Sequence, residues 1–209
     1  MPVNRRRFLA LAMGFPAVAS ASVTAPASPP PVSDIVATIL SHAATPRHSN
    51  ELWVLIDDKE AVLSIFRGNT LIERFAPISL GTGGARTQRV RGDSTTPLGE
   101  FRVYRFNRQS KWHIFIGIDY PTPPHARMAL ETGIYSQADY EAYFDEYRRY
   151  GFPPQDTALG GAIGIHGIGT SDPEIHGRYH WTQGCIAVNN QQIERIASLV
   201  DVGTRVVIR

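Results

Sequence analysis

The sequence predicts a mainly β domain, a sandwich or a barrel, that carries two or three short helices. Three observations lead to this fold class. Short runs rich in Val, Ile, Leu and aromatic residues alternate with polar residues at a period of two. Turn-forming Asp, Gly, Asn and Pro residues separate these runs. After residue 50, only two segments repeat their hydrophobic residues at a helical period.

The first three expected strands follow one another closely along the chain. The turns at Asp57–Lys59 and Arg67–Asn69 separate them. Because the expected strands are short and numerous, a β-rich sandwich or barrel is the natural architecture. The expected strands are residues 52–56, 61–66, 70–80, 99–106, 112–118, 162–166, 186–188 and 205–208.

Two helices are expected between the strands. Ser136 and Asp139 form a capping box that opens a helix over residues 136–150, and Gly151 ends it. The Tyr and Phe residues of this helix recur at helical spacing, which predicts packing against the core. The alternative is a lid over the functional site, because the segment precedes the strand that ends at His166. A second helix is expected at residues 190–200.

The N-terminal part divides into three expected segments before the domain at 51–209. Residues 1–21 have the twin Arg, short apolar stretch and small residues of a twin-arginine signal peptide. Residues 22–32 form an Ala/Ser/Pro-rich linker, and residues 33–50 form a short helix and lead-in. The apolar stretch is too short to span a bilayer, so we expect a periplasmic protein without stable membrane insertion.

The charge of the chain does not favour a nucleic-acid partner. The formal charge is +2, and removal of residues 1–21, which contain three Arg and no acidic residue, changes it to −1. Nucleic-acid-binding domains normally carry clustered Lys and Arg on one face. Arg86, Arg89 and Arg91 lie among Gly and Thr, and we interpret them as a solvated loop, with substrate contact as the alternative.

Cys185 is the only cysteine, and it is the candidate nucleophile. A thiol needs a base to become a thiolate, and His166, nineteen residues earlier, can accept its proton. Each residue adjoins an expected strand, so adjacent strands would bring them together. Gly184 leaves space for a substrate carbonyl, and the amides of Gly184 and Cys185 could donate to an oxyanion.

Two other interpretations of these residues stay open. A lone cysteine is often an inert, buried apolar residue. Alternatively, Cys185 could bind zinc together with His166, His176 and His180, although a second cysteine and a paired ligand motif are missing.

The sequence resembles the L,D-transpeptidase family (YkuD type), whose signature is His-Gly, a spacer, Ser or Thr, any residue, Gly, Cys and a nearby Asn. Further similar segments are Gly92–Phe101, Ser110–His113, Asp119–Pro121 and Gly203–Ile208, so the resemblance covers about residues 51–209. The signature corresponds here to His166-Gly167, Thr182-Gln183-Gly184-Cys185 and Asn189.

The resemblance implies a β-rich enzyme that acts on peptidoglycan stem peptides without a metal or other cofactor. In the family, the cysteine attacks the carbonyl of the L-centre of diaminopimelate, expels the terminal D-Ala and forms a thioester. Cys185 would be the nucleophile and His166 the general base and acid. The Gly167 carbonyl would orient the imidazole, Thr182 would support the turn or the oxyanion site, and Gly184 would give access.

The sequence also departs from the common family pattern. Ala187 replaces an Arg that can meet a substrate carboxylate, and Arg178 is the expected replacement. Gln183 replaces a His, and His180 and Asn189 complete the expected substrate-binding residues, although an exposed loop is the more ordinary place for His180.

These departures resemble the branch that includes enzymes hydrolysing the link between murein and its attached lipoprotein. That lipoprotein is therefore a possible partner, and water a possible acceptor, which would make the protein an amidase or hydrolase. A non-catalytic wall-binding module and a structural secreted protein with an inert thiol are the alternatives from other classes.

Overall fold

The computed structural model describes residues 44–209. The expected signal peptide, the linker and residues 33–43 of the expected lead-in helix lie outside the described residues. Within the described part of the chain, no helix combines the length and the hydrophobicity needed to cross a bilayer.

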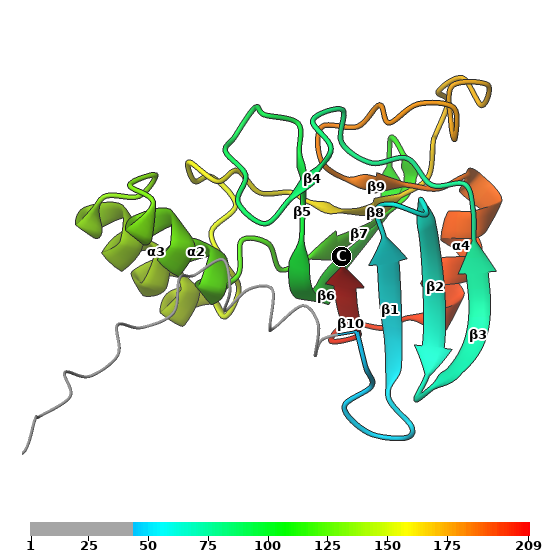
Figure 1. Ribbon diagram of the computed structural model, residues 1–209, viewed down its shortest axis with the longest axis horizontal. Helices are drawn as coiled ribbons and strands as arrows, with labels where there is room; N and C mark the ends of the chain where they lie inside the picture. Colours follow the sequence, from blue (N-terminus) through cyan, green and yellow to red (C-terminus); the bar gives the residue numbers. More distant parts are fainter. Residues whose placement is uncertain (1–43) are drawn as a thin grey trace, which may run out of the picture. The chain divides into compact units, whose positions relative to one another are not determined.

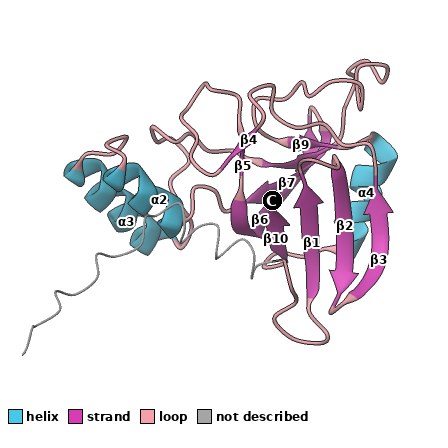
Figure 2. Ribbon diagram, in the orientation of Figure 1, coloured by secondary structure: helices cyan, strands magenta, loops and turns pink. Residues whose placement is uncertain are grey.

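Eight strands form one open, mixed sheet in the order β3-β2-β1-β10-β6-β7-β8-β9 (Figures 1 and 2). Neighbours pair antiparallel except β1 with β10 and β8 with β9, which are parallel. The mainly β prediction is confirmed, and among residues 44–209 this sheet does not close into a barrel. The strands are β1 (Leu52–Asp57), β2 (Val62–Arg67), β3 (Thr70–Phe75), β6 (Gly99–Ser110), β7 (His113–Ile118), β8 (Gly164–His166), β9 (Ile186–Ala187) and β10 (Arg205–Ile208), while β4 (Ala85–Arg86) and β5 (Thr96–Pro97) pair separately.

The strand expected at 70–80 is shorter than predicted. It ends at Phe75, and Pro77 then lacks the N–H that a continued ladder would need. The chain crosses instead to the far edge of the sheet, where Ser79 exchanges two backbone hydrogen bonds of 2.8 and 2.9 Å with Ala187. The segment after β3 therefore covers β9, which would otherwise expose an unpaired edge.

Three helices are present among the described residues: α2 (Pro123–Glu131), α3 (Gln137–Tyr150) and α4 (Asn190–Leu199). The sequence missed α2 because two prolines open it, although Pro is well tolerated in a first helical turn. Capping boxes at Ser136 and Asn189 start α3 and α4, and Gly151 ends α3 with a φ of 74°. The expected helices at 136–150 and 190–200 are both present.

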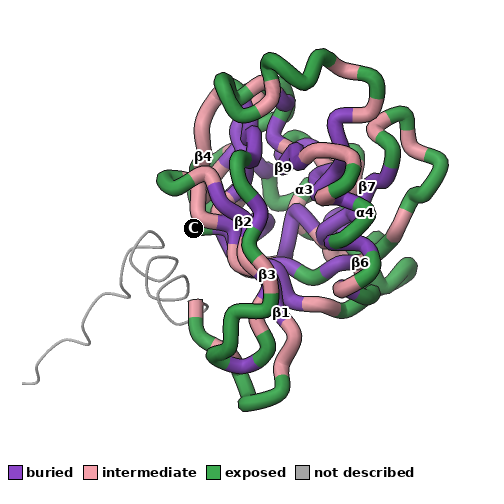
Figure 3. Tube along the Cα trace, turned by 90° about the vertical axis from the view of Figure 1, so that its right-hand side faces the viewer, coloured by how far each residue is buried: buried purple, intermediate pink, exposed green. Residues whose placement is uncertain are grey.

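The main core lies between the sheet and the segments that cover it (Figure 3). Helix α4 packs on β7 and β8, the strands that carry His166 and its cross-strand partner. Helix α2 packs on α3, whose Tyr143 is buried and donates a 2.7 Å hydrogen bond to the carbonyl of Pro121. The neighbouring Tyr140, Phe144 and Tyr147 are partly buried against the core, as expected for a packing face.

On the face of the sheet that points away from the main core, Arg205 holds the chain before β1 against β10. Its buried guanidinium donates to both carboxylate oxygens of Glu51 at 2.8 and 3.1 Å, and it lies 4.8 Å above the Trp53 ring. A two-pronged Arg–carboxylate pair of this kind fixes orientation as well as charge. It ties β10 to the residue that immediately precedes β1.

Replacing Arg205 with Met should lower the free energy of unfolding by about 3 kcal/mol, because the partly buried Glu51 carboxylate loses its partner. Urea denaturation would measure the change. The matched control is Arg209→Met, which removes an exposed ion pair with Asp57 and should cost less than about 1 kcal/mol. Equal losses in the two variants would contradict a special role for Arg205.

Candidate active site

The parallel pairing of β8 with β9 brings His166 and Cys185 to neighbouring strands. The register sets Ile165 opposite Ile186 and His166 opposite Ala187, so Cys185 lies just before the paired segment. On the other side of β8, His166 pairs with Phe115 of β7, and directly opposed residues share a face of the sheet. Phe115 lines the cavity into which Cys185 opens, so His166 lies on that same face.

The imidazole of His166 is held in one tautomer. Its Nδ1 donates a 2.7 Å hydrogen bond to the Gly167 carbonyl, which leaves a lone pair on Nε2 when the ring is neutral. Trp112 and Phe115 stack on the ring, with centroids 5.1 and 6.5 Å away. Burial lowers the pKa of His166, and nearby His176 adds to this effect, while the Gly167 hydrogen bond opposes it. The ring is therefore prepared to accept a proton.

The thiol of Cys185 is half-buried at the wall of the cavity. It lies 3.5 Å from the Ala162 carbonyl oxygen, to which it donates, and it is not hydrogen-bonded to His166. Burial raises the pKa of the thiol to about 11, although a backbone hydrogen bond with Gly164 and the charge of Arg89 act in the opposite direction. Near neutral pH the pair is therefore a thiol and an imidazole rather than a preformed ion pair.

A tight turn delivers Cys185 to the cavity. The Thr182 hydroxyl donates to the Cys185 carbonyl at 2.7 Å and accepts from the Gly184 amide at 3.1 Å. Thr182 thus supports the turn, and the Cys185 amide is the remaining candidate donor to an oxyanion. Gly184 has a φ of 119°, and a Cβ there would meet the Thr95 carbonyl oxygen at 2.5 Å and Arg89 Nη1 at 2.6 Å. Only glycine fits this position.

The cavity beside Cys185 has a volume of about 830 Å³ and a cationic lining. Its aromatic wall contains Trp112 and Phe115, the two rings that stack on His166. No residue of α3 is among those that line it, so the structure offers no support for the alternative of α3 as a lid. The charged residues of the lining are Arg89, Arg91, Arg105, Lys111 and Asp156.

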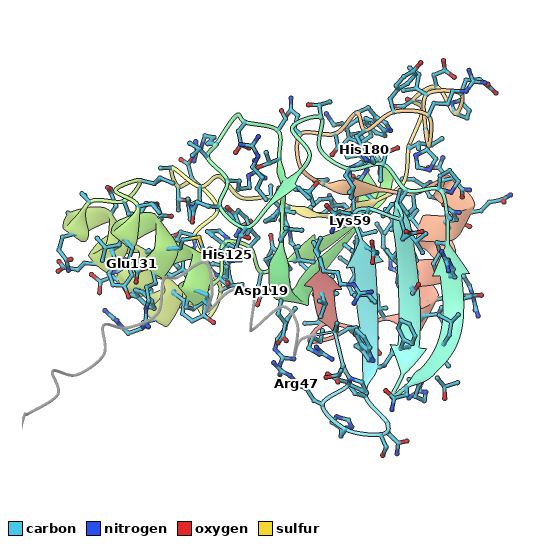
Figure 4. All side chains as sticks on the ribbon, in the orientation of Figure 1. Arg47, Lys59, Asp119, His125, Glu131 and His180 are labelled. Atoms are coloured by element: carbon cyan, nitrogen blue, oxygen red, sulfur yellow. The ribbon has the colours of Figure 1, made fainter. Side chains whose placement is uncertain are left out.

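Of the four expected substrate-binding residues, only Gln183 lines the cavity, and the other three lie elsewhere. Arg178 lies on an exposed loop, where it forms a 2.9 Å ion pair with Glu174, and it is not part of the lining. His180 is exposed in the same loop (Figure 4), and its Nδ1 accepts a 3.1 Å hydrogen bond from the Leu80 amide. The Asn189 side chain is used as the N-cap of α4.

The histidines considered as zinc ligands hold this loop in place. The Nδ1 atom of His176 lies 3.3 Å from the Ser79 hydroxyl, while His180 contacts Leu80. Among residues 44–209, no group of three or more His, Cys, Asp or Glu side chains is arranged to hold a metal ion. Both contacts fasten the loop to the segment that follows β3.

The sequence analysis did not identify Asn190, and it gave substrate contact by Arg89 only as the alternative interpretation. Arg89 was interpreted as part of a solvated loop, but its side chain is only 5% exposed and lines the cavity. That interpretation is wrong because Arg89 folds inward beneath Gly184, which the local Gly/Thr composition does not reveal. Asn190 exchanges two 2.9 Å hydrogen bonds with the backbone of Gly169, which fixes the chain after His166.

The comparisons agree with this architecture. The family model for the YkuD L,D-transpeptidase catalytic domain matches residues 51–208. The chain therefore belongs to the L,D-transpeptidase catalytic domain family, as the sequence resemblance predicted. No match was found among curated protein sequences.

Several solved structures are similar to this chain. The helical cell shape determining protein Pgp2 from Campylobacter jejuni is 18% identical with a TM-score of 0.51, covering 83% of this chain and 54% of that one. An L,D-transpeptidase from Xylanimonas cellulosilytica is 20% identical (TM-score 0.43; 79% and 63% covered). Another from Mycobacterium smegmatis is 14% identical (TM-score 0.41; 76% and 58% covered). The chain thus spans about half to two thirds of these proteins.

The low pKa of His166 sets the expected pH dependence of the reaction. A base must be neutral, so kcat/KM should fall only as the pH drops through the pKa of His166, which burial places below 6.5. At pH 6.5 more than half of the plateau value of kcat/KM should remain. A pH–rate profile measures this, and a midpoint above 6.5 would contradict the assignment.

The raised pKa of Cys185 predicts slow alkylation near neutral pH. The rate of alkylation by iodoacetamide, measured as a function of pH, should have its midpoint near pH 11.

Proposed function

We propose that the protein is an exported enzyme of peptidoglycan remodelling that acylates Cys185 with a diaminopimelate-containing stem peptide. The observation that carries the proposal is the parallel pairing of β8 with β9, which places His166 beside the segment that begins after Cys185, a residue of the cavity lining. The tautomer that Gly167 imposes on His166 supports the role of base. Membership of the L,D-transpeptidase catalytic domain family supports the reaction class.

In the proposed first half-reaction, Cys185 is the nucleophile and His166 is the general base and acid. As Cys185 Sγ attacks the carbonyl carbon of the L-centre of diaminopimelate, its proton moves to Nε2 of His166. The Cys185 amide donates to the oxygen that gains charge. The carbon–nitrogen bond to the terminal D-Ala then breaks, and His166 returns the proton to the leaving amine. The product is a thioester between the shortened stem peptide and Cys185.

The charge of the cavity supports an anionic peptide substrate. A stem peptide carries free carboxylates at diaminopimelate and at its C-terminus, and the cavity lining holds four cationic side chains against the single carboxylate of Asp156. Asp156 also pairs with Arg91. Complementary charge of this kind raises the local concentration of substrate.

The second half-reaction decides between two enzyme types. An amine acceptor makes the protein a transpeptidase, whereas water makes it an amidase or hydrolase that could release a murein-attached lipoprotein. Periplasmic localisation is proposed from the twin-arginine pattern in residues 1–21, and Western blotting of cell fractions would test it. Both enzyme types share the Cys185 thioester.

Cys185→Ala should abolish turnover and leave the fold intact, because the nucleophile is lost while only one sulfur atom is removed. The test is mass spectrometry of products from tetrapeptide muropeptides and from lipoprotein-linked muropeptides, with circular dichroism as the control for folding. Cross-linked or exchanged products identify a transpeptidase, and a released lipoprotein remnant identifies an amidase. Turnover that persists in Cys185→Ala would contradict the mechanism.

His166→Ala should slow acylation by about 10² to 10⁴-fold, the usual contribution of a general acid–base residue. Single-turnover measurements of the intact-protein mass would follow the thioester directly. His113→Ala is a matched control, because His113 is an exposed histidine that contacts Glu194 and does not line the cavity. A loss below threefold in His166→Ala would remove His166 from this role.

A further inference from the structure

Arg89 is a buried cation whose hydrogen-bonding capacity is largely unused. Its side chain is 5% exposed, and neither Nε nor Nη1 has a hydrogen-bond partner. The Tyr120 ring lies 5.7 Å from Cζ. The nearest carboxylate oxygen, Asp93 Oδ1, is 3.7 Å from Nε, which is too long for a hydrogen bond.

The Asp93 carboxylate is already committed to other donors. It accepts from the amides of Val90 and Thr95 and from the Thr95 hydroxyl, at 2.8 to 2.9 Å. A guanidinium stays charged at all ordinary pH values, and buried polar groups normally have hydrogen-bond partners. A buried cation that keeps donors unpaired lowers stability. Its position in the cavity wall is therefore typical of a group that awaits an anionic ligand.

The guanidinium lies against the residue that precedes Cys185. A Cβ on Gly184, the residue before Cys185, would be 2.6 Å from Nη1, and a Cβ on Gly160 would be 3.6 Å from Nη2. Both positions are glycines, so neither contributes a side chain that would cover the guanidinium. Gly160 and Cys185 line the same cavity as Arg89. Arg89 thus lies beneath the part of the cavity where a substrate carbonyl meets Cys185.

We propose that Arg89 binds the terminal carboxylate of the amino acid that leaves when Cys185 is acylated. The inference rests on the proposed function, since it assigns a leaving group to that reaction. The carboxylate is one residue beyond the attacked carbonyl, and consecutive Cα atoms are about 3.8 Å apart. Arg89 lies against Gly184, the residue that precedes the proposed nucleophile. Arg–carboxylate pairing is among the strongest charged contacts in proteins.

No other arginine considered for this role has the same position. Arg178 is exposed and paired with Glu174, outside the cavity. The position two residues after Cys185 is the fully buried Ala187, which is bonded to Ser79 and does not line the cavity. If Arg89 recognises this carboxylate, the residue expelled on acylation must be the C-terminal residue of the stem peptide. Stems extended by one residue should be poor substrates.

The test compares a tetrapeptide stem that ends in a free carboxylate with the same stem ending in a carboxamide. Unmodified protein should prefer the acid by about 10 to 100-fold in kcat/KM, the range expected for a charged hydrogen bond. Arg89→Gln should lose this preference, mainly through a higher KM for the acid, so that kcat/KM falls much further for the acid than for the amide. Arg89→Lys should retain part of the preference because it keeps the charge.

Arg86→Gln is the matched control, because it removes the same charge from an exposed side chain outside the cavity. It should preserve the preference for the acid. Thermal unfolding should show that Arg89→Gln is at least as stable as the unmodified protein, since Nε and Nη1 have no hydrogen bonds to lose. The proposal would be overturned if Arg89→Gln kept the acid-to-amide ratio of kcat/KM, whether both values persist or both fall equally.

A binding measurement separates failure of this proposal from failure of the proposed function. Calorimetry of the two stems with Cys185→Ala and with Cys185→Ala/Arg89→Gln measures recognition without turnover. If the acid binds more tightly than the amide, and this difference depends on Arg89, the proposal is supported. This holds even if the unmodified protein turns over neither stem. Absence of turnover would overturn only the proposed function. Equal affinities of the acid and the amide for Cys185→Ala would overturn the proposal alone.

Discussion

The parallel pairing of β8 with β9 is the constraint on which the site depends. These two strands contain only three and two residues, yet their register places His166 beside the segment that Cys185 opens. Parallel neighbours require a crossing connection, here the chain between His166 and Cys185. Asn190 fastens the beginning of this connection through Gly169, and His176 fastens its middle through Ser79. The geometry of the site thus depends on contacts made well outside it.

Burial favours the neutral form of both candidate catalytic groups, because it shifts their pKa values in opposite directions. It raises the pKa of the Cys185 thiol and lowers the pKa of the His166 imidazole, which favours the neutral form of each group. Charge in the cavity comes instead from three arginines and Lys111, which outnumber the single carboxylate of Asp156. A neutral reacting pair beside fixed cations suits a reaction in which negative charge arrives with the substrate and grows on its carbonyl oxygen.

The sequence predicted best those helices whose ends are marked by characteristic residues. The capping box at Ser136 and the left-handed Gly151 are short-range features that the sequence contains in full. The capping box at Asn189 was not recognised, because that residue was expected to bind substrate. By contrast, α2 was missed because its opening prolines are equally typical of a turn, and burial of His125 against Phe101 and Tyr120 stabilises it. The early end of β3 follows from Pro77, a signal that the alternation of neighbouring side chains obscured.

The sequence by itself determined the mainly β class, the family resemblance and the two residues proposed for the chemistry, because strand periodicity and the spacing of His166, Gly184 and Cys185 are local patterns. Only the tertiary structure decided which charged residues reach the cavity. Arg178 is close to Cys185 in the chain but is held on an exposed loop by Glu174. Arg89 is almost a hundred residues away in the sequence and yet lies under Gly184. Long-range packing sets such contacts, and no local pattern encodes them.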